Sequence, residues 1–178
     1  MKRSLRFFAA LPLFLIVLLN SCGYHTAGKA SHLPPDLHVL AVPVFVNQTQ
    51  VFKIEQIMTR DVIREFIERT KYRVTNSSTD GAGADATLKG TVISAQATPL
   101  TYDAQTGRIS SAVVIITAKV TLTDRNGRVL FENLNYTFRE QYQVSSEINS
   151  FFAEEAPAMQ RLSRDFARTL VSDVLEGF

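Results

Sequence analysis

The sequence contains one cysteine, Cys22, so no disulfide can form within the chain and apolar packing must hold the fold together. After its first 21 residues it has no uncharged run long enough to cross a bilayer. The three histidines, His25, His32 and His38, are not spaced with Cys, Asp or Glu as metal ligands usually are. Glycine-rich phosphate loops and GxSxG nucleophile motifs are also missing. These absences predict no enzyme, no metal site and no bound cofactor.

The chain begins with basic residues and a run without charges, Phe7–Leu19, that only Pro12 interrupts. This length is typical of a secretory signal, since a spanning helix needs about 20 apolar residues. The run ends at Leu19-Asn20-Ser21-Cys22, which resembles the lipobox of bacterial lipoproteins. We therefore predict that residues 1–21 are a cleaved signal peptide and that Cys22 carries a covalent lipid. The alternatives are a secreted protein with a free thiol, and an uncleaved membrane anchor.

Lipidation at Cys22 would fix the protein to a membrane permanently. Each buried CH₂ contributes about 0.8 kcal/mol, and a bacterial lipoprotein cysteine usually carries three acyl chains, palmitate among them. Gly23 follows the cysteine, where an aspartate is the inner-membrane retention signal of enterobacteria. We therefore expect a lipid anchor in the outer membrane, with the domain on its periplasmic side.

Removal of residues 1–21 leaves 157 residues, which suits a single domain with a sizeable core. This mature chain has 16 basic and 17 acidic residues, a net charge of −1, and no basic stripe of the kind that binds nucleic acid. Residues 22–36 lack an apolar period and are predicted to form a lipidated tether. Residues 37–178 are predicted to form one domain.

Alternating apolar residues and turn signals predict the strands. Asn126-Gly127 predicts a hairpin with a type I′ turn, residues 75–85 predict a loop, and residues 99–108 predict a connection. Leu130, Leu134, Tyr136 and Phe138 are expected in phase on one face. The predicted strands are Val39–Val46, Tyr72–Val74, Thr87–Ala97, Ile109–Thr123 and Val129–Tyr142.

Two segments, Ile54–Lys71 and Glu154–Glu176, carry apolar stripes at helical spacing. Pro157 fits only the first turn of the second helix, and Gly177 suits its C-cap. The stripes are Ile54, Ile57, Met58, Val62, Phe66 and Ile67 in the first helix, and Met159, Leu162, Phe166, Leu170 and Val174 in the second. The expected fold is α+β, a mostly antiparallel sheet of about four to five strands with two helices packed on one face.

Several segments together resemble the LptE family of lipopolysaccharide-assembly lipoproteins. Cys22-Gly23-Tyr24-His25 resembles the mature start of that family, and residues 42–49, Val-Pro-Val-Phe-Val-Asn-Gln-Thr, resemble its first strand. Residues 84–92, Ala-Asp-Ala-Thr-Leu-Lys-Gly-Thr-Val, resemble the segment that begins a later strand in that family. The Asp124–Phe131 hairpin and the closing helix are also similar, so the resemblance covers nearly the whole mature chain.

The resemblance implies a non-catalytic role. A member of this family sits inside the LptD β-barrel of the outer membrane, assists assembly of that barrel, and takes part in lipopolysaccharide transport to the cell surface. The alternative is an outer-membrane lipoprotein of another kind, such as a subunit of a curli-like secretion pore or a generic envelope scaffold.

Lipopolysaccharide presents phosphates above acyl chains, so its contact surface should offer cations beside apolar or hydroxyl-bearing side chains. Strand and turn cations that the sequence places at one end of a sheet are the candidates, although each can also be an ordinary solvated charge. Arg108 and Lys119 are ranked first, followed by Lys89, Arg125 and Arg128. The adjacent acids Glu154 and Glu155 fit the first turn of a helix better than a catalytic pair.

Overall fold

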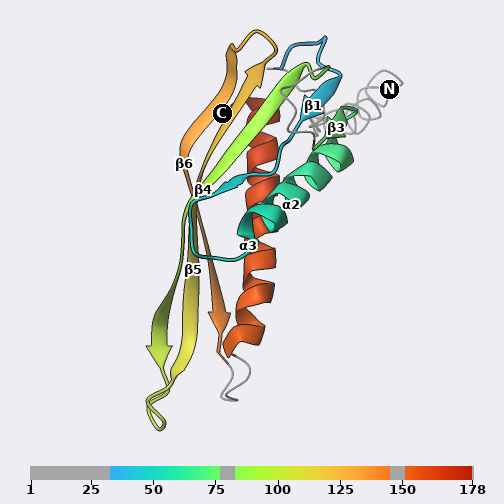
Figure 1. Ribbon diagram of the computed structural model, residues 1–178. Helices are drawn as coiled ribbons and strands as arrows, with labels where there is room; N and C mark the ends of the chain where they lie inside the picture. Colours follow the sequence, from blue (N-terminus) through green and yellow to red (C-terminus); the bar gives the residue numbers. More distant parts are fainter. Residues whose placement is uncertain (1–32, 77–82, 145–150, 178) are drawn as a thin grey trace, which may run out of the picture.

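The protein is a long sheet with helices along one side (Figure 1). The structure, a computed structural model, describes residues 33–76, 83–144 and 151–177. The predicted signal peptide, the predicted lipidation site Cys22, and the histidines His25 and His32 lie outside these residues. The elements in chain order are β1 (Val39–Ala41), β2 (Val46–Asn47), α2 (Ile54–Arg69), β3 (Arg73–Thr75), β4 (Ala86–Tyr102), β5 (Ile109–Asp124), β6 (Val129–Gln143) and α3 (Phe151–Glu176).

The sheet combines antiparallel and parallel pairing. Its strand order is β3-β1-β4-β5-β6, and β2 pairs with β4 beside β1. The long strands β4, β5 and β6 are antiparallel, whereas the short strands β1, β2 and β3 join in parallel. Figure 1 shows α2 and α3 on the same side of the sheet. The expected α+β fold with two helices on one face is confirmed, with six strands in a mixed sheet.

The predicted strand Val39–Val46 is wrong as one element, because the chain leaves the ladder after Ala41 and rejoins it at Val46. Pro43 lies in the break and cannot donate a ladder hydrogen bond. The break turns Phe45 into the core, where its ring lies directly on Gly90 of β4. Its backbone N–H donates to Thr59 Oγ1 of α2 at 2.9 Å, so the break joins the sheet to the first helix.

Helix α3 supplies the other half of the core. Its predicted stripe is buried throughout, and the Phe166 ring makes edge contacts with Phe45, Tyr136 and Phe138 at centroid distances of 5.4–6.2 Å. The predicted cap is confirmed, since Gly177 has φ 76° and its N–H donates to Asp173 O at 2.8 Å. The prediction for Pro157 is wrong, because α3 begins at Phe151 and the proline lies inside it.

The stripe of α2 is narrower than the sequence predicts. Ile54, Met58, Val62 and Phe66 are buried, but Ile67 is 57% exposed and the helix ends at Arg69 rather than Lys71. Asp61, at 2% exposure, is buried instead and pairs with Arg60 at 3.2 Å and Arg64 at 3.3 Å. The two arginines satisfy a carboxylate that would otherwise be costly to bury.

Two irregularities change which side chains face the core. Strand β4 continues past Pro99 to Tyr102, where the sequence predicts a connection. In this part β4 pairs with β5 alone, so the N–H group that proline lacks would face an unpaired edge, and the strand tolerates the proline. In β6 an extra residue follows Asn133. Phe131 and Tyr136 are therefore buried while Leu134 is 59% exposed. The expected phase is wrong for Leu134, whereas Leu130 and Phe138 pack against the core.

The β5–β6 hairpin is present, but its predicted type I′ turn is wrong. Gly127 has φ 81°, whereas Asn126 does not have the positive φ that a type I′ turn requires. Gly127 N–H donates to Asp124 O at 3.0 Å, and Asp124 N–H donates to Arg128 O at 2.9 Å. This is a type I turn followed by a left-handed glycine.

The contact between Phe45 and Gly90 predicts that Gly90→Ala is strongly destabilising. A Cβ at position 90 would lie 2.5–2.6 Å from three atoms of the Phe45 ring. Overpacking of this kind costs about 1–3 kcal/mol, which urea unfolding monitored by circular dichroism can measure. Lys89→Ala, at the adjacent exposed position, is the control and should change the unfolding free energy by no more than about 0.5 kcal/mol.

A second variant distinguishes this contact from a general intolerance of β4. In the double variant Gly90→Ala with Phe45→Leu, leucine at position 45 is smaller than phenylalanine and leaves room for the new Cβ. The double variant should therefore recover part of the stability that Gly90→Ala loses. A Gly90→Ala protein as stable as the wild type would contradict the packing described above.

Candidate functional site

The sheet has one covered face and one open face. Along β5 the residues facing the helices are buried, and the alternate residues face away from them. We call the outward residues of β4, β5 and β6 the open face. In β5 its members are Val113, Ile115, Thr117, Lys119, Thr121 and Thr123.

The open face carries threonine hydroxyl groups, three cations and one carboxylate, Glu132, which accepts a hydrogen bond from Thr121 at 3.4 Å. Lys89 pairs with Thr121, and Lys119 pairs with Thr91, so the two lysines are diagonal neighbours on adjacent strands. Such neighbours have Cα atoms about 7–8 Å apart. Arg139 of β6 pairs with Ile115 on the same face. The sequence prediction did not include Arg139, although the expected inward phase of Tyr136 and Phe138 already places it on the outward face of β6.

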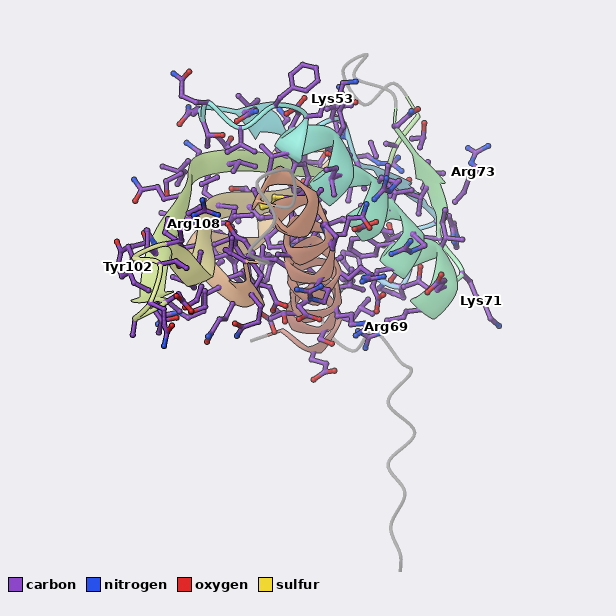
Figure 2. All side chains as sticks on the ribbon, turned by 90° about the horizontal axis from the view of Figure 1, so that it is seen from below. Lys53, Arg69, Lys71, Arg73, Tyr102 and Arg108 are labelled. Atoms are coloured by element: carbon purple, nitrogen blue, oxygen red, sulfur yellow. The ribbon has the colours of Figure 1, made fainter. Side chains whose placement is uncertain are left out.

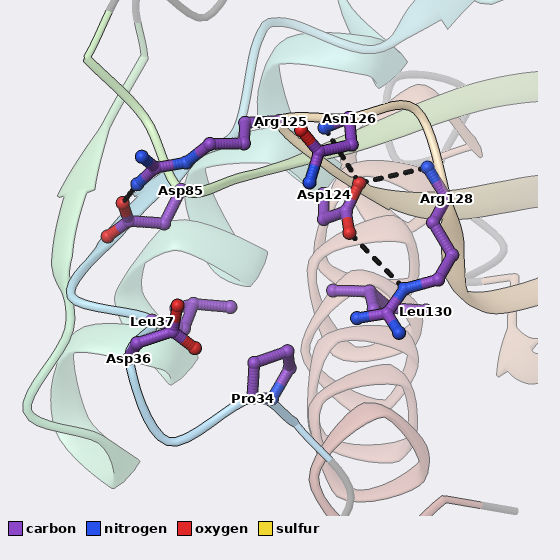
Figure 3. A pocket seen from close by; sticks show the side chains of 9 residues that line it. All are labelled: Pro34, Asp36, Leu37, Asp85, Asp124, Arg125, Asn126, Arg128 and Leu130. Carbon is purple, nitrogen blue, oxygen red and sulfur yellow. Dashed lines mark hydrogen bonds and ion pairs between the residues drawn. The ribbon is translucent and has the colours of Figure 1, made fainter.

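Arg125 and Arg128 belong to the turn at one end of the sheet, and both are already engaged in ion pairs. Arg125 pairs with Asp85 at the start of β4, and Arg128 Nε pairs with Asp124 Oδ2 at 3.2 Å. These residues line a pocket of about 190 Å³ with Pro34 and Leu37 (Figure 3). The pairs close the turn and leave both guanidinium groups less available to an outside anion.

Asp85 is the residue that joins this end of the molecule together. Its Oδ2 accepts hydrogen bonds from the backbone N–H groups of His38, at 2.7 Å, and Val39, at 2.8 Å, while its Oδ1 pairs with Arg125. These hydrogen bonds lower the pKa of the Asp85 carboxyl below its ordinary value, and the bond from His38 N–H has the largest effect. A single carboxylate thus connects the entry to β1, the entry to β4 and the β5–β6 turn.

Arg108 lies at the other end of the sheet, in the β4–β5 hairpin that extends past the start of α3 (Figure 1). Asp103 orders the tip, accepting hydrogen bonds from Thr106 N, at 2.7 Å, and Gln105 N, at 3.0 Å. The side chain of Tyr102 is 63% exposed, and Figure 2 shows it on the same side of the molecule as Arg108.

The structure therefore does not gather the five predicted cations at one end of the sheet. Strand β5 has 16 residues, about 50 Å of extended chain, and separates Arg108 from Arg125 and Arg128. Lys89 and Lys119 lie between these ends, on the open face. The expectation of one patch fails because adjacent strands run in opposite directions, so successive turns lie at opposite ends.

The described residues contain no group of three or more His, Cys, Asp or Glu side chains that could hold a metal ion. The one histidine among them, His38, is exposed just before β1. Glu154 and Glu155 lie in the first turns of α3, where the side chains are not described. No described helix is both long enough and apolar enough to cross a membrane.

Comparison with known proteins identifies a family. The sequence model of the lipopolysaccharide-assembly family LptE matches residues 37–174. No curated protein matches the chain.

Solved structures with a similar fold are distant in sequence. Lipoprotein B from Nitrosomonas europaea has a TM-score of 0.56 at 14% identity, over 87% of this chain and 92% of that one. A lipoprotein structure from Caulobacter crescentus has a TM-score of 0.52 at 12% identity, over 75% and 89%. A PelC dodecamer from Paraburkholderia phytofirmans has a TM-score of 0.50 at 15% identity, over 83% and 93%. At these identities the likeness concerns the fold alone.

The Asp85 hydrogen bonds predict an acid-sensitive fold. Because the folded-state pKa is lowered, the carboxylate stabilises the fold above its ordinary pKa of about 3.9, and this contribution is lost as the pH falls through the lowered value. Asp85→Asn should lower the melting temperature at neutral pH and flatten its decline below about pH 4. Asp165→Asn, which removes a 61% exposed carboxylate 3.7 Å from Arg168, is the control and should leave the profile unchanged. Identical profiles for Asp85→Asn and the wild type would contradict the role given to Asp85.

Proposed function

Because the chain belongs to the LptE family of lipopolysaccharide-assembly proteins, we propose that it is a plug and adaptor for an LptD-like β-barrel of the outer membrane. A lipid on Cys22 would anchor it on the periplasmic side, and the folded domain would sit inside the barrel and assist its assembly. Family membership agrees with a non-enzymatic role. The domain would act by presenting surfaces to two partners, the barrel wall and lipopolysaccharide.

One observation supports this proposal most directly, namely the division of the sheet into a covered and an open face. The helices bury one side of β4, β5 and β6 and leave the other side without any described element across it. An antiparallel sheet can keep such a face in water, and the same face is available to the wall of a barrel that surrounds the domain. The part of the open face from Thr117 to Thr123 is polar and rich in hydroxyl groups, as is the interior of an outer-membrane barrel.

Two regions are suited to lipopolysaccharide. Lys89, Lys119 and Arg139 place three cations among threonine hydroxyls on the open face, where phosphates and sugars can both be bound. Arg108 and the exposed Tyr102 offer a cation and an aromatic ring at the projecting hairpin end. Arg125 and Arg128 are the weakest of the predicted contacts for lipopolysaccharide, because they already form ion pairs with Asp85 and Asp124.

The proposed plug should be recovered in a one-to-one complex with a single large outer-membrane protein that survives mild detergent. Photo-crosslinking residues introduced at Arg108 and Arg128, at opposite ends of the sheet, should both capture that protein if the barrel surrounds the domain. A crosslinker at Leu88, which is fully buried, is the matched negative control. Recovery of self-crosslinked rings alone would contradict the plug and favour a secretion-pore subunit.

Lipopolysaccharide binding should depend on the open-face lysines and on Arg108 separately. Lys89→Glu with Lys119→Glu should weaken binding of labelled lipopolysaccharide by about tenfold or more, because phosphates lose charge-assisted partners and meet repulsion. Arg108→Glu should weaken it further and independently, since the sites are far apart. Binding by all forms should fall as salt rises.

The control for this experiment is Arg164→Glu with Arg168→Glu, which makes the same change in net charge at two exposed positions of α3, away from the open face and the hairpin end. It should bind lipopolysaccharide like the wild type, and circular dichroism should show all variants folded. If a folded Lys89→Glu, Lys119→Glu variant binds lipopolysaccharide as well as the wild type, the open face does not contact the lipid. If Arg108→Glu binds as well as the wild type, the hairpin end does not contact it.

A further inference from the structure

A second group of cations lies at the edge of the sheet opposite β6. Arg69 ends α2, Lys71 follows it, and Arg73 begins β3, the outermost strand on that side. We call these three residues the basic edge. In Figure 2 the side chains of Lys71 and Arg73 project away from the body of the molecule on the same side.

Two of these cations have no partner within the described protein. Arg69 is held by Ser172 Oγ at 2.7 Å and lies 3.8 Å from Glu65. Lys71 and Arg73 are exposed and form no ion pair with any described residue. The nearby Glu68 pairs with Arg64 at 3.9 Å instead. The charge of Lys71 and Arg73 is therefore directed outward.

The basic edge lies where the N-terminal segment enters the fold. Arg73 N–H donates to His38 O at 2.8 Å, and Arg73 pairs with Val39 in parallel register. The segment just before it is held against the domain, since Leu33 and Leu37 are buried in the core. Asp36 is an exposed carboxylate on this segment, but the other two acids beside it, Asp85 and Asp124, are already neutralised by arginines.

From this placement we infer that the basic edge rests on the anionic phospholipid headgroups of the membrane that holds the lipid anchor. The inference takes the anchor at Cys22 from the proposed function, but it does not require lipopolysaccharide or a barrel. Between Cys22 and Leu33 there are eleven Cα steps, which span at most about 40 Å when fully extended. A tether of that length keeps the basic edge within reach of the headgroups and raises its local concentration there.

Anionic headgroups are the occupant that fits this chemistry. Exposed lysine and arginine side chains beside a membrane anchor are attracted to acidic lipids over about a Debye length, roughly 8 Å at physiological ionic strength. Two outward cations are too few to hold a free protein on a bilayer, but they are enough to orient one that is already tethered. The hairpin end with Arg108 would then point away from the leaflet that carries the anchor.

Lysine footprinting on anchored protein tests this inference. The mature chain from Cys22 onward keeps all the buried core residues, which lie between Leu33 and Leu175. Its single thiol can be coupled to a maleimide-headgroup lipid in vesicles, which reproduces the anchor whatever the natural modification is. Vesicles of phosphatidylcholine alone are compared with vesicles that also contain phosphatidylglycerol, and acetylation rates are read by mass spectrometry.

The described residues contain four lysines, Lys53, Lys71, Lys89 and Lys119, all of them exposed and each a separate reporter. We expect acetylation of Lys71 to slow several-fold on the anionic vesicles, and the other three to keep their rates. Added salt, or the variant Arg73→Glu, should restore the rate of Lys71. Circular dichroism shows whether the variant is folded.

Two results would overturn the inference, namely an unchanged Lys71 rate on anionic vesicles and an equal slowing of all four lysines. The first shows no headgroup contact, and the second shows that the domain has no preferred orientation. Because the vesicles contain no lipopolysaccharide and no barrel, neither result bears on the proposed plug function, which the crosslinking and binding experiments decide.

Discussion

The packing of the Phe45 ring on Gly90 is the contact on which the rest of the fold depends. It requires a residue without a side chain in the middle of β4, and it requires the chain to leave the sheet between β1 and β2 so that Phe45 can turn inward. Thr59 of α2 accepts the Phe45 N–H, and the Phe166 ring of α3 packs edge-on against the Phe45 ring. One side chain therefore joins the sheet and both helices, and its position sets where each helix can lie.

One of the segments that resemble the LptE family, residues 84–92, has a structural role rather than a chemical one. In residues 84–92, Asp85 binds the backbone at the entry to β1, Leu88 and Val92 enter the core, and Gly90 accommodates Phe45. Alternate residues of the same strand, Thr87, Lys89 and Thr91, face the open side. The motif therefore identifies the fold, whereas the residues proposed to meet a partner lie between its members, where stability does not restrict the choice of side chain.

The sequence predicts both helices, the long strands and the β5–β6 hairpin, because their apolar periods are long and regular. Its errors fall where one residue interrupts a period. The extra residue after Asn133 changes the phase of β6 between Phe131 and Tyr136 and leaves Leu134 exposed. Pro99 is tolerated in β4 only because the edge beside it is unpaired. Among the candidate contacts, Lys89 and Lys119 are neighbours only through strand register. The pairing of Arg125 with Asp85, 40 residues away, is long-range and cannot be read from local sequence.

If the Phe45 cluster holds the domain together, the amides around it should open only when the whole protein unfolds. Native-state hydrogen exchange, followed residue by residue, tests this directly. The account predicts that Leu88–Val92 of β4 and the turns of α3 around Phe166 exchange most slowly, with an opening free energy equal to that of global unfolding. It also predicts that the projecting β4–β5 end, residues 99–112, exchanges through smaller openings. Slowest exchange at the projecting end, with faster exchange at Leu88–Val92, would contradict the account.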